Sequence, residues 1–190
     1  MRIAIVIDST LHHYWDRLSA AALRRFGVDL PYEEQLDWGI TRLRRDQLHL
    51  CIQETHCEEA ILAGEPYPDA VETVKRWHED GHFVHITSHR DPLARDPTAR
   101  WLAQIGVPYD DLHCSRDKVG RCLELGIELL IDDSPENLLR AIDHGMLTAT
   151  IAHPWNRELC DEEDVICAPH WRGLAAKLDP LLRRRIRVRP

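Results

Sequence analysis

The sequence predicts an α/β fold, in which a Rossmann-like parallel sheet is flanked by helices and carries an inserted helical cap. Three observations predict this fold. Apolar, β-branched runs recur along the chain and stop at polar residues, as strands buried on both faces of a parallel sheet do. Most of these runs follow a helical pattern that ends in glycine. More than fifty residues after the first run show helical patterns alone.

The predicted strands alternate with predicted helices along most of the chain. The first strand ends at Asp8, and three of the later strands follow Gly81, Gly126 and Gly145. Strands that alternate with helices form βαβ units, whose connections are right-handed and whose ligands bind beyond the carboxyl ends of the strands. The predicted strands are residues 2–7, 82–87, 111–114, 127–131 and 147–151.

The helices between these strands are predicted from amphipathic spacing. In the first of them, Pro68 occupies the first turn, and one face carries Val71, Val74 and Trp77. The glycine after each helix takes the left-handed conformation that follows a helix end without steric cost. The predicted helices are residues 68–80, 97–105, 118–125 and 134–144.

Residues 12–65 interrupt this alternation and predict a helical cap over the carboxyl end of the first strand. An apolar stripe at helical spacing runs from Trp15 to Phe26, and a second helical region covers residues 41–62. The expected organisation is a core of residues 1–11 and 66–171, a cap of residues 12–65, and a C-terminal helix and basic tail of residues 172–190.

The net charge of −8 is unevenly distributed. Residues 172–190 hold seven Lys and Arg against one Asp, which leaves 17 basic and 31 acidic side chains in residues 1–171. An acidic body argues against a nucleic-acid surface over the core. Only the basic residues of 183–190 are candidates for nucleic-acid binding, and a solvated charged tail is the favoured interpretation.

Apolar runs and cysteines indicate the compartment. No apolar run approaches the ~20 residues of a membrane span or the hydrophobic region of a signal peptide, so we expect no membrane partner and a cytoplasmic location. The six cysteines include no CxxC pair. Because cytosolic proteins normally keep cysteines reduced, we expect free thiols.

Polar residues follow the predicted strands where the carboxyl ends of the strands meet. Two adjacent carboxylates at the end of a buried strand are costly without a nearby cation, which predicts Mg²⁺. Hydroxyl and ammonium groups beside them suit a phosphate group. The polar residues are Asp8 to Thr10, Ser88 to Arg90, Lys118 at the start of a helix, and Asp132 with Asp133.

These motifs, in this order and spacing, resemble the haloacid dehalogenase superfamily of phosphohydrolases. The resemblance is greatest to its 5′(3′)-deoxyribonucleotidase-like branch, which carries a helical cap, and it extends to about Arg157. The matching segments are Asp132-Asp133-Ser-Pro-Glu-Asn137, the lysine fourteen residues before Asp132, Thr87-Ser88-His-Arg90, and Pro154-Trp-Asn156.

The resemblance implies a role for each matched residue. The implied catalytic residues are Asp8 and Lys118. The implied phosphate-binding residues are Thr10, Ser88, Arg90 and Lys118. The implied ligands of the cofactor, Mg²⁺, are Asp8, Asp132 and Asp133. The implied ligand or substrate is a small phosphorylated metabolite or a nucleotide.

One position departs from the first motif of the family, which reads D-x-D-x-T/V-L. The segment here is Val6-Ile-Asp8-Ser-Thr10-Leu, so valine stands where the family has the aspartate that attacks phosphorus. Valine neither attacks phosphorus nor binds a cation, and loss of a covalent nucleophile costs on the order of 10⁶ in rate. The sequence therefore predicts a homologue of the phosphohydrolases with impaired or altered chemistry.

The sequence is compatible with three explanations of Val6. In the first, phosphoryl transfer is lost and the chain is a non-catalytic protein that binds a nucleotide or phosphometabolite. In the second, Asp8 is the nucleophile, with Thr10 two residues on, which resembles the D-x-T arrangement of cation-pumping ATPases. In the third, the carboxylates hold a metal ion that activates water directly.

Side chains after the first motif are weaker candidates. His12, His13, Tyr14 and Trp15 stand where a nucleobase would stack, although a buried Trp15 with exposed histidines is the favoured interpretation. The scattered His and Cys residues lack zinc-ligand spacing. Residues 161–164 are expected to form a solvated acidic turn.

Overall fold

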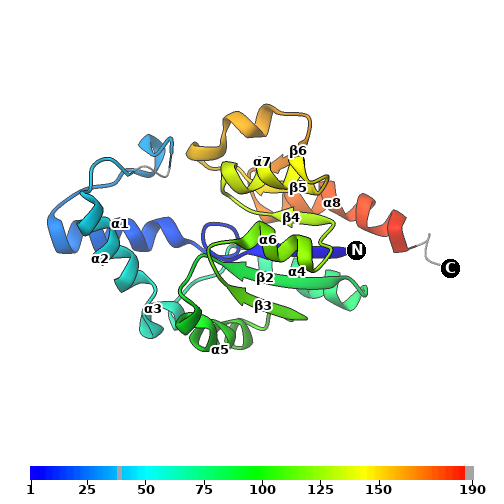
Figure 1. The fold of residues 1–190 in the computed structure, drawn as a ribbon, viewed down its shortest axis with the longest axis horizontal. Coiled ribbons are helices and arrows are strands. Elements are labelled where there is room, and N and C mark those ends of the chain that lie inside the picture. The colour runs from blue at the N-terminus through cyan, green and yellow to red at the C-terminus, as the bar shows by residue number, and fades with distance from the viewer. Residues whose placement is uncertain (38–39, 187–190) are drawn as a thin grey trace.

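The structure of the protein, a computed structural model, describes residues 1–37 and 40–186. Within these residues, six parallel strands form one sheet in the order β3-β2-β1-β4-β5-β6. Helices lie against the sheet, and the predicted α/β fold is confirmed (Figure 1). The strands are β1 (Arg2–Val6), β2 (Phe83–Ser88), β3 (Asp111–Cys114), β4 (Leu129–Ile131), β5 (Leu147–Ile151) and β6 (Val165–Ala168).

The sequence does not predict the edge strand β6. Its four residues follow an acidic segment and have no amphipathic helix directly before them, so they lack the signals that mark the other strands. β6 pairs with β5 along its whole length, from Thr148 opposite Val165 to Ile151 opposite Ala168. This strand therefore forms because it pairs with β5, and no local sequence pattern indicates it.

The helices between the strands begin and end within two residues of the predicted bounds. A longer C-terminal helix follows β6. It packs against the same face of the sheet as the helix that begins at Ala70. These helices are α4 (Ala70–Glu79), α5 (Arg95–Ile105), α6 (Lys118–Glu124), α7 (Pro135–Asp143) and α8 (Trp171–Ile186). The short 3₁₀ turns among them are η2 (Pro92–Ala94), η3 (Pro154–Asn156) and η4 (Glu158–Asp161).

β1 is buried on both faces, and its side chains alternate between two apolar clusters as the pleat of a strand requires. Ile3 and Ile5 belong to the larger cluster, which includes residues of α4, α5 and α8. Ala4 and Val6 belong to a second cluster, with residues of α6 and α7. Val6 is 2% exposed and lies among apolar neighbours on the α6 side of the sheet.

The segment before α4 is helical and lies off the carboxyl ends of the strands (Figure 1). An apolar cluster joins its first two α-helices to Trp155, which lies beyond the end of β5. This cluster attaches the segment to the carboxyl edge of the sheet. The helices in the segment are α1 (Tyr14–Phe26), η1 (Tyr32–Glu34), α2 (Arg45–Thr55) and α3 (Glu58–Leu62).

The expectation that the cysteines are all free is wrong for one pair. Cys160 and Cys167 form a disulfide, with their Cα atoms 5.1 Å apart. Their spacing in the sequence gives no indication of the bond, because they meet only where η4 lies beside β6. The free cysteines are Cys51, Cys57, Cys114 and Cys122.

The C-terminal helix extends further than the sequence predicts. α8 continues to Ile186, so Arg183, Arg184 and Arg185 belong to the helix and not to a tail after it. Residues 187–190, which carry the rest of the candidate nucleic-acid segment, lie outside the described residues. No helix in the described part of the chain is long and apolar enough to cross a membrane.

Candidate active site

A tight turn after β1 places Asp8 at the carboxyl edge of the sheet. The Ile7 carbonyl accepts hydrogen bonds from three successive backbone N–H groups, those of Thr10, Leu11 and His12. Within the turn, Ser9 has a φ of 59°, in the left-handed region. This conformation costs a residue other than glycine about 1–3 kcal/mol and is found most often at functional sites.

The Asp8 carboxylate accepts hydrogen bonds from three side chains. Ser88, the last residue of β2, donates its hydroxyl to Oδ2 over 2.6 Å. The Arg90 guanidinium donates to Oδ1 over 2.8 Å. His12 Nε2 lies 3.0 Å from the same oxygen and donates to it when that nitrogen carries the proton. Asp8 is therefore held in one position by groups from β1, β2 and the following turns.

The electrostatics of this cluster keep Asp8 ionised. Burial by itself raises the pKa of Asp8, but the charge of Arg90 and the hydrogen bond from His12 outweigh burial and hold the pKa well below its usual value. Burial also lowers the pKa of His12, although the bond to Asp8 opposes this. The expectation of an exposed histidine is wrong for His12, which is 3% exposed.

Arg90 is buried to 2% exposure, which is unusual for a guanidinium. Besides Asp8, it donates to Thr98 Oγ1 over 3.1 Å, and its Cζ atom lies 5.9 Å from the centre of the Trp101 ring. Its Nε has no hydrogen-bond partner among the described residues. In the structure the Arg90 guanidinium therefore pairs with Asp8, whereas the resemblance implies that Arg90 binds a phosphate group directly.

A second ion pair lies at the neighbouring strand end. Lys118, the first residue of α6, places Nζ 3.0 Å from Asp132 Oδ2, and both side chains are almost fully buried. Asn137 Nδ2 donates to the same oxygen over 2.8 Å, and the Ser134 N–H donates to Asp132 Oδ1 over 3.0 Å. Asp132 is therefore fully satisfied, as a buried carboxylate must be.

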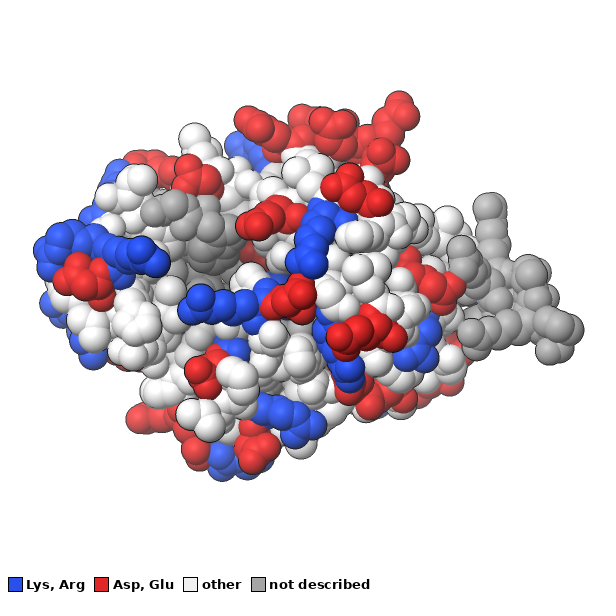
Figure 2. All heavy atoms as spheres, in the orientation of Figure 1, with Lys and Arg blue, Asp and Glu red and all other residues white. Residues whose placement is uncertain are grey.

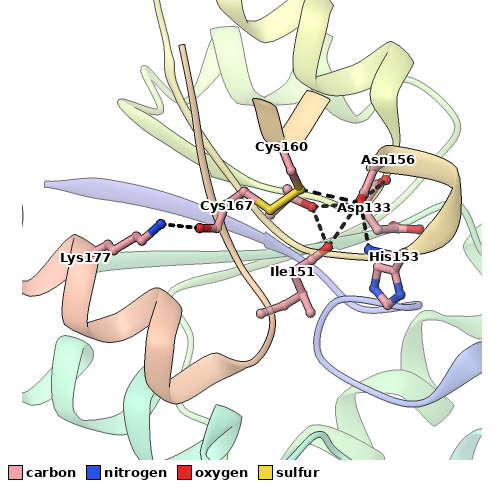
Figure 3. The surroundings of a disulfide bond; sticks show 8 residues. Asp133, Ile151, His153, Asn156, Cys160, Cys167 and Lys177 are labelled. Carbon is pink, nitrogen blue, oxygen red and sulfur yellow. Dashed lines mark hydrogen bonds between the residues drawn. A yellow bond between two sulfur atoms is a disulfide. The ribbon is translucent and has the colours of Figure 1, made fainter. Parts of the chain in front are cut away.

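Asp133 contacts the segment after β5 (Figure 3). The Trp155 indole N–H donates to Asp133 Oδ2 over 3.1 Å, and Asn156 Nδ2 donates to the Asp133 carbonyl over 3.2 Å. Burial, and then the charge of Asp132, raise the pKa of the Asp133 carboxyl well above its usual value, against the opposing charge of Lys118. Asp133 thus differs electrostatically from Asp8, whose pKa is lowered.

Three hydroxyl groups at this edge are buried and have no hydrogen-bond partner among the described residues, namely those of Ser9, Thr10 and Thr87. An unpaired buried polar group costs about 1–3 kcal/mol, so such groups call for an explanation. Hydroxyl donors that lie beside a buried arginine and lysine suit an anion such as phosphate.

The predicted site residues meet at the carboxyl edge of three adjacent strands. Asp8 follows β1, Ser88 ends β2 and Asp132 follows β4, and β1 pairs with both of the other strands. The structure therefore brings these residues together.

A cavity of about 270 Å³ lies between α1, η1 and the end of β5, and the predicted catalytic, phosphate-binding and metal-binding residues are not among its lining residues. Aromatic side chains line much of it, and one of its residues, His153, places Nε2 2.7 Å from the Ser9 carbonyl. Burial, Tyr32 and then Asp133 raise the pKa of Tyr67, so the cavity lies within electrostatic range of Asp133. Its aromatic and imidazole residues are His13, Trp15, Tyr32, Tyr67 and His153.

Comparisons with known proteins show the family and the fold of the chain. The model of a family described as "5' nucleotidase, deoxy (Pyrimidine), cytosolic type C protein" matches residues 1–177. The chain belongs to this nucleotidase family. A "Putative 5'(3')-deoxyribonucleotidase" of Chlorobaculum tepidum is 28% identical over 170 residues, which are 83% of this chain and 81% of that protein.

Solved structures show the same fold at low sequence identity. A HAD family hydrolase from Deinococcus radiodurans, with bound phosphate and sodium, has a TM-score of 0.65 and 16% identity over 96% of this chain and 95% of its own. A predicted phosphoglycolate phosphatase from Haemophilus somnus has a TM-score of 0.64 and 14% identity over 95% and 97% of the two chains. The HAD-like fold expected from the motifs is thus confirmed.

The carboxylates of this nucleotidase family member do not form the predicted set of Mg²⁺ ligands. Among the described residues, no group of three or more His, Cys, Asp and Glu side chains is close enough together to hold a metal ion. Asp8 and Asp132 each have a buried cationic partner, and Val6 offers no oxygen. The residues present therefore do not fit the three-carboxylate site that the resemblance implies, and no step below depends on a metal.

Some residues at the site had no role in the sequence analysis. Asn156 belongs to a matching motif, but only the structure shows that its amide bonds to the Asp133 carbonyl. His153 contacts the Ser9 carbonyl from 144 residues away in the sequence. A histidine directly before Pro154-Trp-Asn156 was the available signal, but nothing in the sequence indicates its partner.

Proposed function

We propose that this nucleotidase family member binds the phosphate group of a nucleotide or another small phosphorylated metabolite at the carboxyl edge of its sheet, with altered phosphohydrolase chemistry. The observation that carries the proposal is a set of buried hydroxyls without a hydrogen-bond partner among the described residues, those of Ser9, Thr10 and Thr87, at the sheet edge where Arg90 and Lys118 also lie. Such donors in a site shielded from water bind phosphate oxygens strongly.

Each site residue has a role in this proposal. Lys118 offsets phosphate charge, and the unpaired Thr10 hydroxyl donates to a phosphate oxygen. The Ser88 hydroxyl donates to a phosphate oxygen in exchange for its bond to Asp8. Arg90 holds Asp8 ionised and in place, which makes it a positioning residue for Asp8. Where chemistry remains, Asp8 is the group that exchanges a proton with, or attacks, the phosphate ester.

The aromatic cavity favours a nucleotide over a simple sugar phosphate. A planar base fits between aromatic rings, which stack with about 0.5–1.5 kcal/mol beyond their buried area. His13 and Trp15, both candidates for base stacking, line the cavity. We also propose that residues 12–65 act as a cap over the site, because their apolar cluster includes Trp155, which bonds to Asp133. A cytoplasmic location, supported by the words "cytosolic type" in the family description, is part of this proposal.

A second candidate is a non-catalytic nucleotide-binding protein. The packing of Val6 among apolar residues of α6 and α7 favours it, because the position that the resemblance aligns with the family's nucleophile then belongs to the core. The second candidate shares the binding site of the first and differs only in turnover.

Calorimetric titration with nucleoside monophosphates and with inorganic phosphate tests binding. We expect Lys118→Gln and Ser88→Ala to weaken binding, and Lys75→Gln, which changes an exposed lysine of α4, to leave it unchanged. If no ligand binds, the proposal is wrong. The Mg²⁺ dependence implied by the resemblance is tested by the same titration with MgCl₂, for which we expect weak binding at most.

Turnover distinguishes the two candidates. Hydrolysis of an aryl phosphate that disappears in Asp8→Asn supports residual phosphohydrolase chemistry. Binding without turnover above the buffer rate supports the non-catalytic protein.

A further inference from the structure

The Cys160–Cys167 disulfide lies directly behind the segment that supports the site (Figure 3). Cys160 belongs to η4 and Cys167 to the edge strand β6. Both cysteines are only partly buried, which leaves part of each residue accessible to a small molecule in solution. On the β6 side, Lys177 Nζ donates to the Cys167 carbonyl over 2.7 Å and holds the strand to α8.

Asn156 connects the disulfide to the site. Its side chain is 1% exposed, and its Nδ2 donates to the Asp133 carbonyl, to Thr150 Oγ1 over 2.9 Å and to the Ile151 carbonyl over 3.0 Å. Its Oδ1 accepts from the His153 N–H over 2.7 Å and lies 4.0 Å from Cys160 Sγ. A shift of Cys160 therefore acts on a side chain that, together with Trp155, ties the segment after β5 to Asp133.

The same segment reaches the two loops that carry the site. Trp155 bonds to the Asp133 carboxylate, and His153 contacts the carbonyl of Ser9, the residue after Asp8. A series of contacts through Asn156, Trp155 and His153 thus leads from the disulfide to the loops after β4 and β1.

The disulfide is a covalent restraint on η4. None of the residues of η4 is buried, so apolar packing holds it weakly. Acidic side chains are exposed at residues 161–164, which begin with the last residue of η4, and Figure 2 shows acidic groups along the upper rim of the molecule. Like charges that crowd a short segment repel one another, which favours its release when the covalent bond is cut.

We propose that the Cys160–Cys167 pair is a thiol–disulfide modification site whose redox state controls ligand binding at the carboxyl edge. The oxidised pair holds η4 and Asn156 in place and keeps the loops after β1 and β4 ordered for binding. The reduced pair releases η4, loosens the segment from His153 to Asn156 and weakens binding. The control of binding rests on the proposed function, whereas the release of η4 does not.

The position of the bond favours regulation over a role in holding the whole fold together. The two cysteines are seven residues apart, and short loops gain the least from cross-linking because their closure entropy is small. Disulfides of proteins in a reducing compartment are usually transient and redox-sensing.

The exchange needs a small thiol and a small disulfide of the glutathione type. A thiolate of the reductant attacks one cysteine sulfur, the S–S bond breaks, and a mixed disulfide forms with the other cysteine as the leaving thiolate, which takes up a proton. A second reductant thiolate then resolves the mixed disulfide. The protein gains two electrons and two protons, and two reductant thiols become one disulfide. The small disulfide reverses both steps.

Hydrogen exchange measured by mass spectrometry tests the release of η4. The full chain is compared after treatment with oxidised and with reduced glutathione, and intact mass gives the state of the pair. We expect reduction to speed exchange in peptides that cover residues 130–135 and 150–162 and to leave α4 unchanged. The double variant Cys160→Ser/Cys167→Ser should match the reduced chain under both conditions, and Cys57→Ser, which removes an exposed free thiol, should behave like the wild type.

Titration with inorganic phosphate and a nucleoside monophosphate then tests the control of binding. We expect the reduced chain and the double variant to bind about fivefold or more weakly than the oxidised chain. Equal exchange in both redox states, or a pair that glutathione disulfide does not oxidise, overturns the modification site. Altered exchange with equal affinities overturns the control of binding. Altered exchange with no binding in either state supports the modification site and contradicts the proposed function.

Discussion

At the scale of single residues, charge pairing decides the character of the site. Arg90 and Lys118 are almost fully buried, and each faces one carboxylate within 3.0 Å. Removing one partner of a buried pair leaves an uncompensated charge, which costs more than the pair contributes. The charge state of Asp8 therefore depends more on Arg90, which lies beside it in space, than on its neighbours in the sequence.

We expect Arg90→Met to lower the free energy of unfolding by about 3 kcal/mol at pH 7, because Asp8 then lies buried without its cation. In the wild type the pKa of Asp8 is depressed, so its contribution is present above the unfolded value of about 3.9 and is lost as the pH falls through the folded value. The difference in unfolding free energy between the wild type and Arg90→Met should therefore become smaller as the pH is lowered toward 3. Urea denaturation at both pH values measures it, with Arg95→Met as an exposed control. Equal deficits at the two pH values would contradict the role given to Asp8.

Val6 gives a second prediction at this scale. Its side chain faces α6, whose first residue is Lys118, so an aspartate at position 6 adds a carboxylate on the side of the Lys118–Asp132 pair. Because Mg²⁺ prefers carboxylate oxygens, we expect Mg²⁺ to raise the Tm of Val6→Asp more than that of the wild type. The control is Val6→Asn, because asparagine has the same shape as aspartate and carries no charge. Equal Tm shifts in all three proteins would show that position 6 does not face a cation site.

At the scale of elements, helix α1 positions the segment that covers the carboxyl edge. Its buried face, with Trp15 and Leu18, packs against α2 and Trp155, and Gly27 ends the helix at a φ of 66°. The sequence predicts this helix from its apolar stripe and its terminal glycine. It does not predict that Trp155, more than a hundred residues later, completes the cluster.

We expect Leu18→Ala to destabilise the protein by about 2–4 kcal/mol, because the removed methyl groups leave a cavity in the cluster that joins α1, α2 and Trp155. Leu23→Ala, in the same helix but 54% exposed, should change the free energy of unfolding by less than about 0.5 kcal/mol. Denaturant unfolding followed by circular dichroism gives both values. A similar loss in the two variants would mean that the cluster does not hold α1.

At the scale of the whole molecule, buried histidines couple the fold to pH. His85 in β2 is fully buried, and burial lowers its pKa to about 4. Between pH 6.5 and 4 the unfolded chain binds a proton that the folded chain does not, so this group lowers stability as the pH falls through that window.

We expect the loss of unfolding free energy between pH 7.5 and pH 5 to be about 2 kcal/mol smaller in His85→Leu than in the wild type. His144→Leu, which changes an exposed histidine after α7, should lose as much as the wild type. Urea titrations at the two pH values measure the difference. Identical losses in all three proteins would show that His85 does not carry this pH dependence.

The sequence by itself determined the order and type of most elements and the residues at the carboxyl edge. Both follow from local physics: strands buried on two faces are apolar throughout, amphipathic helices repeat every 3.6 residues, and parallel strands bring their polar ends to one edge. Asp8, Ser88, Lys118 and Asp132 are therefore readable from their places after strands or at a helix start.

Only the tertiary structure decided the partners of these residues. The pairing of Asp8 with Arg90 and His12, the turn of Asp133 toward Trp155, the strand β6 and the Cys160–Cys167 bond all join groups whose positions depend on loops. A periodic pattern places a residue on a face or at an edge, but it does not fix the direction of a side chain beyond the end of a strand. That direction follows from competition among all the donors, acceptors and charges that the fold brings together.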